Sequence, residues 1–216
     1  MTNHYVRQGA TGSNTGTDWT NAWTQLPSTL IRGDTYYIAD GTYPGYVFDD
    51  SISGSLYITI KKATIIDHGT DVGWQNIDGD SQAIFNGTII FFTNDYIIDG
   101  NGTHLIPSDN TNDYGFKISS DSSTNNFGIV QFSGGCNITL KYIHIYNTTN
   151  GSINNCTVCL RFTNNSKYIK IQNCYLENSG KDGIQISSSK WAITQWPNTL
   201  SLTLTCSTSP AWHWKR

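Results

Sequence analysis

Short runs in which apolar and polar residues alternate recur through the second half of the chain. Val130 and Phe132 flank the polar Gln131, and the same order returns around Arg161. A period of two places alternate side chains on opposite faces of a strand, so each run predicts a half-buried β-strand. Asn, Gly, Ser and Asp fill the intervals between the runs, and these residues favour turns.

The runs form a repeat with spacings of 24 to 26 residues. Units of this size cannot bury their own apolar faces, but stacked units share one continuous core, which predicts a solenoid of β-strands. Residues 103–127 interrupt the repeat and are interpreted as an insertion. The alignment predicts one apolar column of Phe92, Phe132, Phe162 and Ile186, and one tyrosine column of Tyr96, Tyr142 and Tyr168.

One segment has the pattern of a short helix. In "TDWTNAWTQLPSTLIRG", Asp18 or Thr20 could cap the start and Gly33 could end it. Pro27 limits its length. We expect a short helix within about 16–33, with one apolar face formed by Ala22, Trp23, Leu26 and Leu30.

The stretch "GTDWTNAWTQLPSTLIRGDTYYIADGTYPG" at 16–45 resembles the first segment of right-handed parallel β-helix proteins of the pectate-lyase-like superfamily. The resemblance implies a helical N-terminal cap, with the first coil starting at "GDTYYIADGTY". We therefore expect an all-β, right-handed parallel β-helix of about five or six coils. Members include polysaccharide lyases, glycoside hydrolases, phage tailspikes and surface proteins without known activity, so the resemblance leaves function open.

The repeat predicts one β-helix domain over residues 1–189. Residues 190–216 differ from it, because they contain four of the seven Trp residues and no acidic residue. One interpretation is a C-terminal cap that covers the last coil. The other is a non-native or truncated tail.

Composition and charge indicate which kinds of partner and which cellular setting the chain is suited to. The net charge of −3 and the scattered Lys and Arg residues give no case for nucleic acid. No apolar run is long enough to span a bilayer, and "MTNHYVRQGA" lacks the apolar region of a signal peptide. Seven N-x-S/T sequons suit an extracellular or cell-surface protein.

The five cysteines provide no strong motif. Cys156 and Cys159 form a CxxC, but no second pair follows at the spacing of a zinc site. We interpret the cysteines as buried structural thiols.

The alternation predicts outward columns that could bind a sugar polymer. One contains Phe91, Gln131, Arg161 and Gln185, and the other contains Ile98, His144 and Lys170. Sugar rings have apolar faces and hydroxyl edges, which suit aromatic side chains beside polar ones. The predicted substrate-binding residues are Tyr96, Tyr142, Tyr168, Gln131 and Gln185. In the alternative interpretation, the tyrosines only stabilise neighbouring coils.

A polysaccharide lyase needs a base, and a cation that stabilises the developing negative charge. His144, Lys170 and Arg161 have the required chemistry and fall in adjacent coils. In the alginate-lyase-like and chondroitinase-like members of the superfamily, a Lys and an Arg take these roles. The alternative is that all three belong to solvated strand faces.

Acidic residues suggest two less favoured sites. A glycoside hydrolase needs two carboxylates, and Asp99, Glu177 and Asp182 are the few acids near the repeat. Acids at 49–50, 67–71 and 78–80 could bind calcium, although none fits an EF-hand. We predict no cofactor and leave calcium as an alternative.

These observations favour an extracellular or surface β-helix module associated with polysaccharide. They predict carbohydrate binding and leave open whether the module also has lyase-like activity. The alternative is a structural or adhesive solenoid, or an inactive fragment of a longer β-helix protein. If the chain is an enzyme, a lyase is favoured over a hydrolase.

Overall fold

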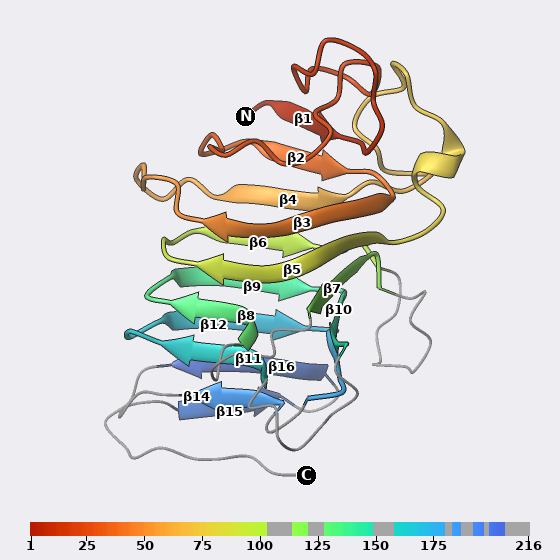
Figure 1. The fold of residues 1–216 in the computed structure, drawn as a ribbon. Helices are drawn as coiled ribbons and strands as arrows, with labels where there is room; N and C mark the ends of the chain where they lie inside the picture. The colour runs from red at the N-terminus through yellow and green to blue at the C-terminus, as the bar shows by residue number, and fades with distance from the viewer. Residues whose placement is uncertain are drawn as a thin grey trace.

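The computed structural model describes residues 1–102, 114–120, 128–148, 158–179 and 183–186, and the strands at 192–196 and 199–205. This part is all-β, apart from the three-residue 3-10 helix η1 (Asn76–Asp78). Up to residue 186, the strands follow one another along the molecule in the direction of the chain (Figure 1). None of the described helices has the length and hydropathy of a membrane span.

The first sheet has the order β1-β2-β4-β6-β9-β12-β16-β15. Its first six strands are parallel, and β16 and β15 then add to β12 as antiparallel strands. The order of the six parallel strands follows the chain, so in this part sequence position sets position along the stack. The strands are β1 (Asn3–Val6), β2 (Thr35–Ile38), β4 (Ile58–Lys62), β6 (Tyr96–Asp99), β9 (Cys136–Lys141), β12 (Lys167–Gln172), β15 (Ala192–Trp196) and β16 (Thr199–Thr205).

The second sheet is parallel throughout, in the order β13-β10-β7-β5-β8-β11-β14, with β3 also paired to β5. Its strands are β3 (Gly41–Phe48), β5 (Ala83–Phe91), β7 (Phe116–Ser120), β8 (Gly128–Ser133), β10 (Ile143–Asn147), β11 (Val158–Thr163), β13 (Tyr175–Glu177) and β14 (Ile184–Ile186). β7 lies within residues 103–127, so part of that expected insertion belongs to the sheet.

The second sheet curls because β5 contributes to two walls. Its first half pairs with β7 and its second half with β8. The bend lies where Gly45 of β3 meets Gly87, whose φ is 141°. A Cβ on Gly45 would lie 2.4 Å from the carbonyl oxygen of Thr88, so only glycine fits this close approach.

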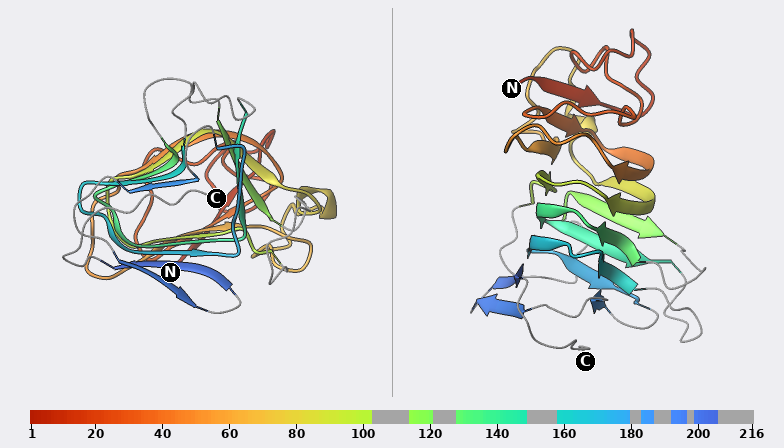
Figure 2. Two further views of the ribbon diagram at one scale, coloured as in Figure 1. Left: turned by 90° about the horizontal axis from the view of Figure 1, so that it is seen from below. Right: turned by 90° about the vertical axis from the view of Figure 1, so that its left-hand side faces the viewer.

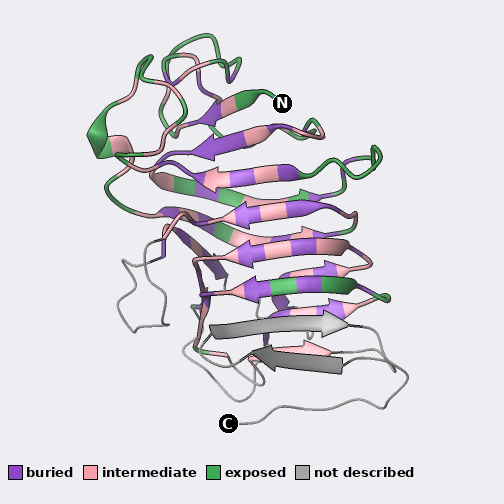
Figure 3. Cartoon of the chain, turned by 180° about the vertical axis from the view of Figure 1, so that it is seen from behind, coloured by how far each residue is buried: buried purple, intermediate pink, exposed green. Residues whose placement is uncertain are grey.

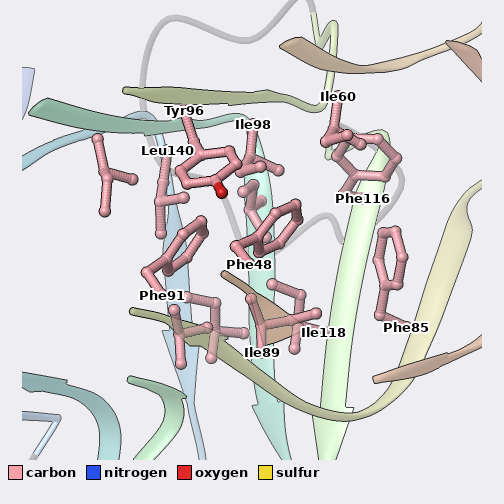
Figure 4. Close-up of a cluster of buried hydrophobic side chains, with 14 of the residues drawn as sticks. Phe48, Ile60, Phe85, Ile89, Phe91, Tyr96, Ile98, Phe116, Ile118 and Leu140 are labelled. Atoms are coloured by element: carbon pink, nitrogen blue, oxygen red, sulfur yellow. The ribbon is translucent and has the colours of Figure 1, made fainter. Parts of the chain in front are cut away.

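The two sheets enclose a common apolar interior (Figures 2 and 3). Inside it, the rings of Phe48, Phe91, Phe132 and Phe162 stack face to face. Successive ring centroids are 4.7, 5.3 and 4.6 Å apart. Tyr96 projects from the first sheet against Phe48 and Phe91 (Figure 4). The apolar alternation of the sequence therefore becomes a continuous ladder of stacked rings.

This ladder confirms most of the predicted apolar column. Phe132, Phe162 and Ile186 occupy equivalent positions on β8, β11 and β14. The prediction that Phe92 belongs to the column is wrong, because Phe91 pairs with Phe132 and Phe92 is 50% exposed.

The predicted tyrosine column is also wrong. Tyr96 pairs with Ile138, and Ile138 pairs with Ile169. Tyr168 therefore lies one position earlier, level with Asn137. The cause is the turn before each of these strands, which lengthens by one residue per coil. In successive coils, the paired residue comes five, six and seven positions after the stacked phenylalanine. An alignment anchored on the Tyr-Ile pairs therefore displaces Tyr168 by one residue, while Tyr142 comes four residues after Ile138, beyond the end of β9, and is not part of the column.

The helix expected within about 16–33 is absent. These residues form bends and turns with an isolated bridge between Val6 and Trp23, and they lie at the N-terminal end of the stack (Figure 1). The expected apolar face is divided between two clusters, because Ala22 packs in a small aromatic cluster while Leu26 and Leu30 pack in the main core. This divided burial, together with Pro27, accounts for the irregular backbone.

Replacing Phe132 by Ala should lower the free energy of unfolding by about 3–5 kcal/mol, since the side chain is fully buried between two rings. Urea unfolding measures the change. Phe92→Ala is the matched control and should cost no more than about 0.5 kcal/mol, because its ring is half exposed. Equal losses in both variants would contradict the observed register.

Tyr168→Asn should stabilise the protein by about 1 kcal/mol. Tyr168 has a φ of 56°, a left-handed conformation that is costly for a bulky residue and better tolerated by Asn. The preceding coils have Asp95 and Asn137 with φ values of 65° and 54° before the corresponding strands. Thermal unfolding should show a higher midpoint. Tyr57→Asn provides the control and should bring no such gain, because Tyr57 does not have a positive φ.

Candidate functional site

Ionisable and aromatic side chains gather on the outer face of three adjacent strands of the second sheet. In the register, His144 lies level with Lys117 on one side and Tyr175 on the other, and Tyr146 lies level with Glu177. We call these residues the β10 cluster: Lys117 from β7, His144 and Tyr146 from β10, and Tyr175 and Glu177 from β13.

Alternation along β10 positions the centre of the cluster. Ile143 and Ile145 are fully buried in the core, so the intervening His144 and the following Tyr146 project to the other face. The same spacing of two residues joins Tyr175 and Glu177 on β13. Sequence reasoning missed Lys117, Tyr146 and Tyr175, although this i, i+2 spacing in "IHIYN" and "YLE" was a signal for two of the three strands.

His144 and Glu177 form the central contact. Nε2 of His144 lies 2.7 Å from Oε2 of Glu177, with side-chain exposures of 1% and 32%. The rings of Tyr114 and Tyr175 lie 6.2 and 5.3 Å from the imidazole. His144 is therefore buried beneath aromatic rings, while the carboxylate it contacts reaches the surface.

The surroundings favour a neutral imidazole. Burial lowers the pKa of His144, the hydrogen bond to Glu177 opposes this effect, and the positive charge of Lys117 lowers the pKa further. A neutral His144 that donates Nε2–H to Glu177 fixes the orientation of the carboxylate. No described group bonds to the buried Nδ1. His144 thus holds the Glu177 carboxylate from beneath the surface.

Lys117 and Tyr146 complete the exposed part of the cluster. Nζ of Lys117 lies 4.4 Å from the centroid of the Tyr146 ring, within the range of a cation–π contact. Both side chains are partly exposed, as are Tyr175 and Glu177. The surface offers an ammonium, a carboxylate, two phenols and two ring faces. These groups suit a ligand with carboxylates, hydroxyls and apolar ring faces.

The structure confirms that Gln131, Arg161 and Gln185 form one outward column on β8, β11 and β14. The fourth predicted member is wrong: Ile90 pairs with Gln131, while Phe91 points into the core. Nε2 of Gln131 donates to the carbonyl oxygen of Gly128 at 3.1 Å. This column is a separate row of polar side chains on the second sheet.

The second predicted column, of Ile98, His144 and Lys170, is not formed. Ile98 is buried, and the actual outward row of the first sheet contains Ile97, Thr139 and Lys170. His144 belongs to the second sheet. The one-residue slip accounts for Ile98, whereas His144 was misplaced because "YIHI" at 142–145 resembles "YIKI" at 168–171 but leads into β10 rather than a strand of the first sheet.

The three predicted catalytic residues therefore do not share one aligned row. Lys170 lies on β12 of the first sheet, Arg161 on β11, and His144 on β10. Only His144 belongs to the β10 cluster, and its burial contradicts the alternative that it lies on a solvated strand face.

The three predicted substrate-binding tyrosines occupy different environments. Tyr96 is buried, its hydroxyl lies 3.1 Å from a carboxylate oxygen of Asp50, and the Arg32 guanidinium lies 4.5 Å from its ring centroid. Burial raises its pKa to about 12. Tyr142 is partly exposed just after β9, and Tyr168 is exposed at the start of β12. No ladder of tyrosines is present among these described residues.

Most acids of the predicted calcium clusters contact other protein groups. Asp67 pairs with Lys61, Asp71 with His68, and Asp78 with Arg7. Asp50 accepts a hydrogen bond from the backbone of Leu30. In the described ranges, no three His, Cys, Asp or Glu side chains come together as metal ligands.

The described cysteines include two buried free thiols. Burial raises the pKa values of Cys159 and Cys174 to about 12, so both thiols are protonated and unreactive. This confirms the structural interpretation for these two residues. Cys136 is free and partly exposed, and Cys156 and Cys206 lie outside the described residues.

The lowered pKa of His144 predicts a pH effect on stability. The unfolded chain takes up this proton near the ordinary histidine pKa of about 6.5, before the folded chain does, so stability should fall as pH falls from about 7.5 to 5.5. The contribution cannot exceed about 1.4 kcal/mol per pH unit. Urea unfolding should show a flatter pH profile for His144→Gln. A profile steeper than that of the wild type would contradict the assignment.

Comparisons with protein-family models, with curated proteins and with solved structures found no match to the chain.

Proposed function

We propose that the chain is a right-handed parallel β-helix that binds an acidic polysaccharide through the β10 cluster. Six parallel strands of the first sheet follow one another in chain order, which supports the expected five or six coils. Residues 16–33 act as an irregular N-terminal cap. The proposed setting is extracellular or at the cell surface.

The observation that carries the functional proposal is the arrangement of Lys117 over Tyr146 beside the His144–Glu177 pair. The ammonium attracts a uronate carboxylate, and the carboxylate of Glu177 accepts hydrogen bonds from sugar hydroxyls. Tyr146 and Tyr175 present rings and hydroxyls to the same ligand. His144 restricts the motion of Glu177, which reduces the entropy lost on binding.

The distribution of charge supports an anionic polymer. Residues 114–186 contain five described Lys and Arg residues but one described acid, Glu177. Such an excess raises the local concentration of polyanions and speeds their association. The basic residues are Lys117, Lys141, Arg161, Lys167 and Lys170.

A lyase is the second candidate, and the contact between Lys117 and Tyr146 favours it over a hydrolase. In an elimination, a base removes the proton beside the uronate carboxylate, the bond to the leaving oxygen breaks, and a carbon–carbon double bond forms. Lys117 would stabilise the developing charge, and a tyrosine in its phenolate form would accept the proton and pass it to the leaving oxygen. Glu177 faces a histidine rather than the second carboxylate that a hydrolase needs.

Binding to polygalacturonate, alginate and neutral dextran tests the proposal. The wild type should bind the two acidic polymers, more weakly at high salt. Lys117→Gln should weaken this binding about tenfold, as expected for the loss of a charged contact. Lys170→Gln is the matched control, because it removes an exposed lysine from the other sheet and should have a smaller effect.

Absence of binding to every polymer would refute the proposal and favour a structural solenoid or an inactive fragment. Equal weakening by Lys117→Gln and Lys170→Gln would show diffuse attraction rather than a site. Ultraviolet absorbance from unsaturated uronate ends would identify the lyase. Its absence, with binding retained, would leave a binding module.

A further inference from the structure

Exposed apolar side chains concentrate along one edge of the molecule, where strands of the second sheet turn into strands of the first. This edge lies on the left of Figure 1 and faces the viewer in the right panel of Figure 2. It holds half of the large exposed apolar side chains of the described residues, each 39–57% exposed. We call it the turn edge, formed by Ile31, Ile52, Leu56, Tyr57, Phe92 and Tyr168.

The ring of Tyr168 is held on this edge against a backbone cost. Its φ is 56°, while Asn137 occupies the corresponding left-handed position one coil earlier with a residue that tolerates it. The Tyr168 ring is 56% exposed, so burial in the core does not offset the strain. The only cation near the ring among the described residues is Lys167, whose Nζ lies 5.8 Å from the ring centroid. A strained residue with an exposed ring motivates the hypothesis of a contact outside the chain.

Charge changes sign along the turn edge. Asp49 is exposed near its N-terminal end, and Lys167 and Lys170 are exposed near its C-terminal end. Arg32 also lies near the N-terminal end, but its guanidinium is occupied by the carbonyl oxygens of Asp50, Asn94 and Asp95.

The same change in the sign of charge extends over all the described residues, from the N-terminal to the C-terminal part. Residues 1–102 contain four Lys and Arg residues and eleven acids, whereas the described residues of 114–186 contain five and one. Because chain order follows the stack, the two halves of the rod carry opposite net charge.

We propose that two copies of this chain pair antiparallel along the turn edge. A two-fold axis makes such an edge self-complementary, because each contact occurs twice. Tyr168 of one copy would pack on Leu56 and Tyr57 of the other, and Lys167 would approach Asp49. Phe92 lies between these regions, near the axis. This interface uses no member of the β10 cluster, so it does not depend on the proposed function.

Sedimentation velocity of the full chain, over a wide concentration range at low and high salt, tests the proposal. The wild type should form a dimer that weakens at high salt. Tyr168→Asn should weaken dimerisation at least about tenfold, the effect of losing an interfacial aromatic anchor. This variant should fold more stably as a monomer, so unfolding would not explain the loss.

Two further variants distinguish a specific contact at this edge from non-specific association through exposed apolar residues. Asp49→Lys should weaken the dimer, and adding Lys167→Asp to that variant should restore it. Ile66→Ser is the control, because Ile66 is 91% exposed on the segment between β4 and β5, which projects on the other side of the molecule (Figure 1). It should leave dimerisation unchanged.

A wild type that stays monomeric at all concentrations would overturn the proposal. So would an Ile66→Ser effect as large as that of Tyr168→Asn, or a charge exchange that fails to restore the dimer. If Tyr168→Asn instead weakened polysaccharide binding by a monomer, the edge would be a sugar-binding surface and the dimer proposal would fall.

Discussion

The stacking of Phe48, Phe91, Phe132 and Phe162 is the constraint on which the rest of the structure depends. Parallel strands repeat about every 4.8 Å, a distance at which aromatic rings can lie face to face. The observed centroid separations of 4.6–5.3 Å match this repeat. Each ring fixes the register of its strand, because a slip of one residue would move it to the opposite face.

That register determines which side chains remain for function. With the phenylalanines inside, Gln131, Arg161 and Gln185 form an outward row. On β10, burial of Ile143 and Ile145 likewise directs His144 and Tyr146 outward, beside groups from β7 and β13. The two proposed surfaces follow from the same stack: one face provides the β10 cluster, and the turns at one edge provide an apolar contact surface.

Much of the fold could be predicted from the sequence, because period-two alternation and repeated turn residues report local structure directly. They predicted an all-β chain of parallel strands and placed Phe132, Phe162 and Ile186 correctly. The errors arose where local pattern does not record turn length. Since the turns before β6, β9 and β12 grow by one residue per coil, Phe92 and Tyr168 were assigned one position away from their true columns. The similarity of "YIHI" to "YIKI" misplaced Tyr142 and His144, which are not on the first sheet.

The site was harder to predict, because it combines strands that are distant in the sequence. His144 was identified, but its contacts with Lys117, Tyr175 and Glu177 depend on the register of β7, β10 and β13. Its burial depends on Tyr114 and Tyr175, which no spacing around His144 reveals. The helix predicted within about 16–33 failed for a related reason: tertiary burial in two separate clusters outweighed the local pattern.

The register depends above all on the stacking of Phe91, rather than Phe92, on Phe132. A double-mutant cycle with leucine substitutions at Phe91 and Phe132, followed by urea unfolding, tests it most directly. Contacting residues should show a coupling free energy of about 0.5–1.5 kcal/mol, whereas the cycle of Phe92 with Phe132 should show additivity within about 0.5 kcal/mol. Additivity of Phe91 with Phe132, and coupling of Phe92 with Phe132, would contradict the register and the surfaces derived from it.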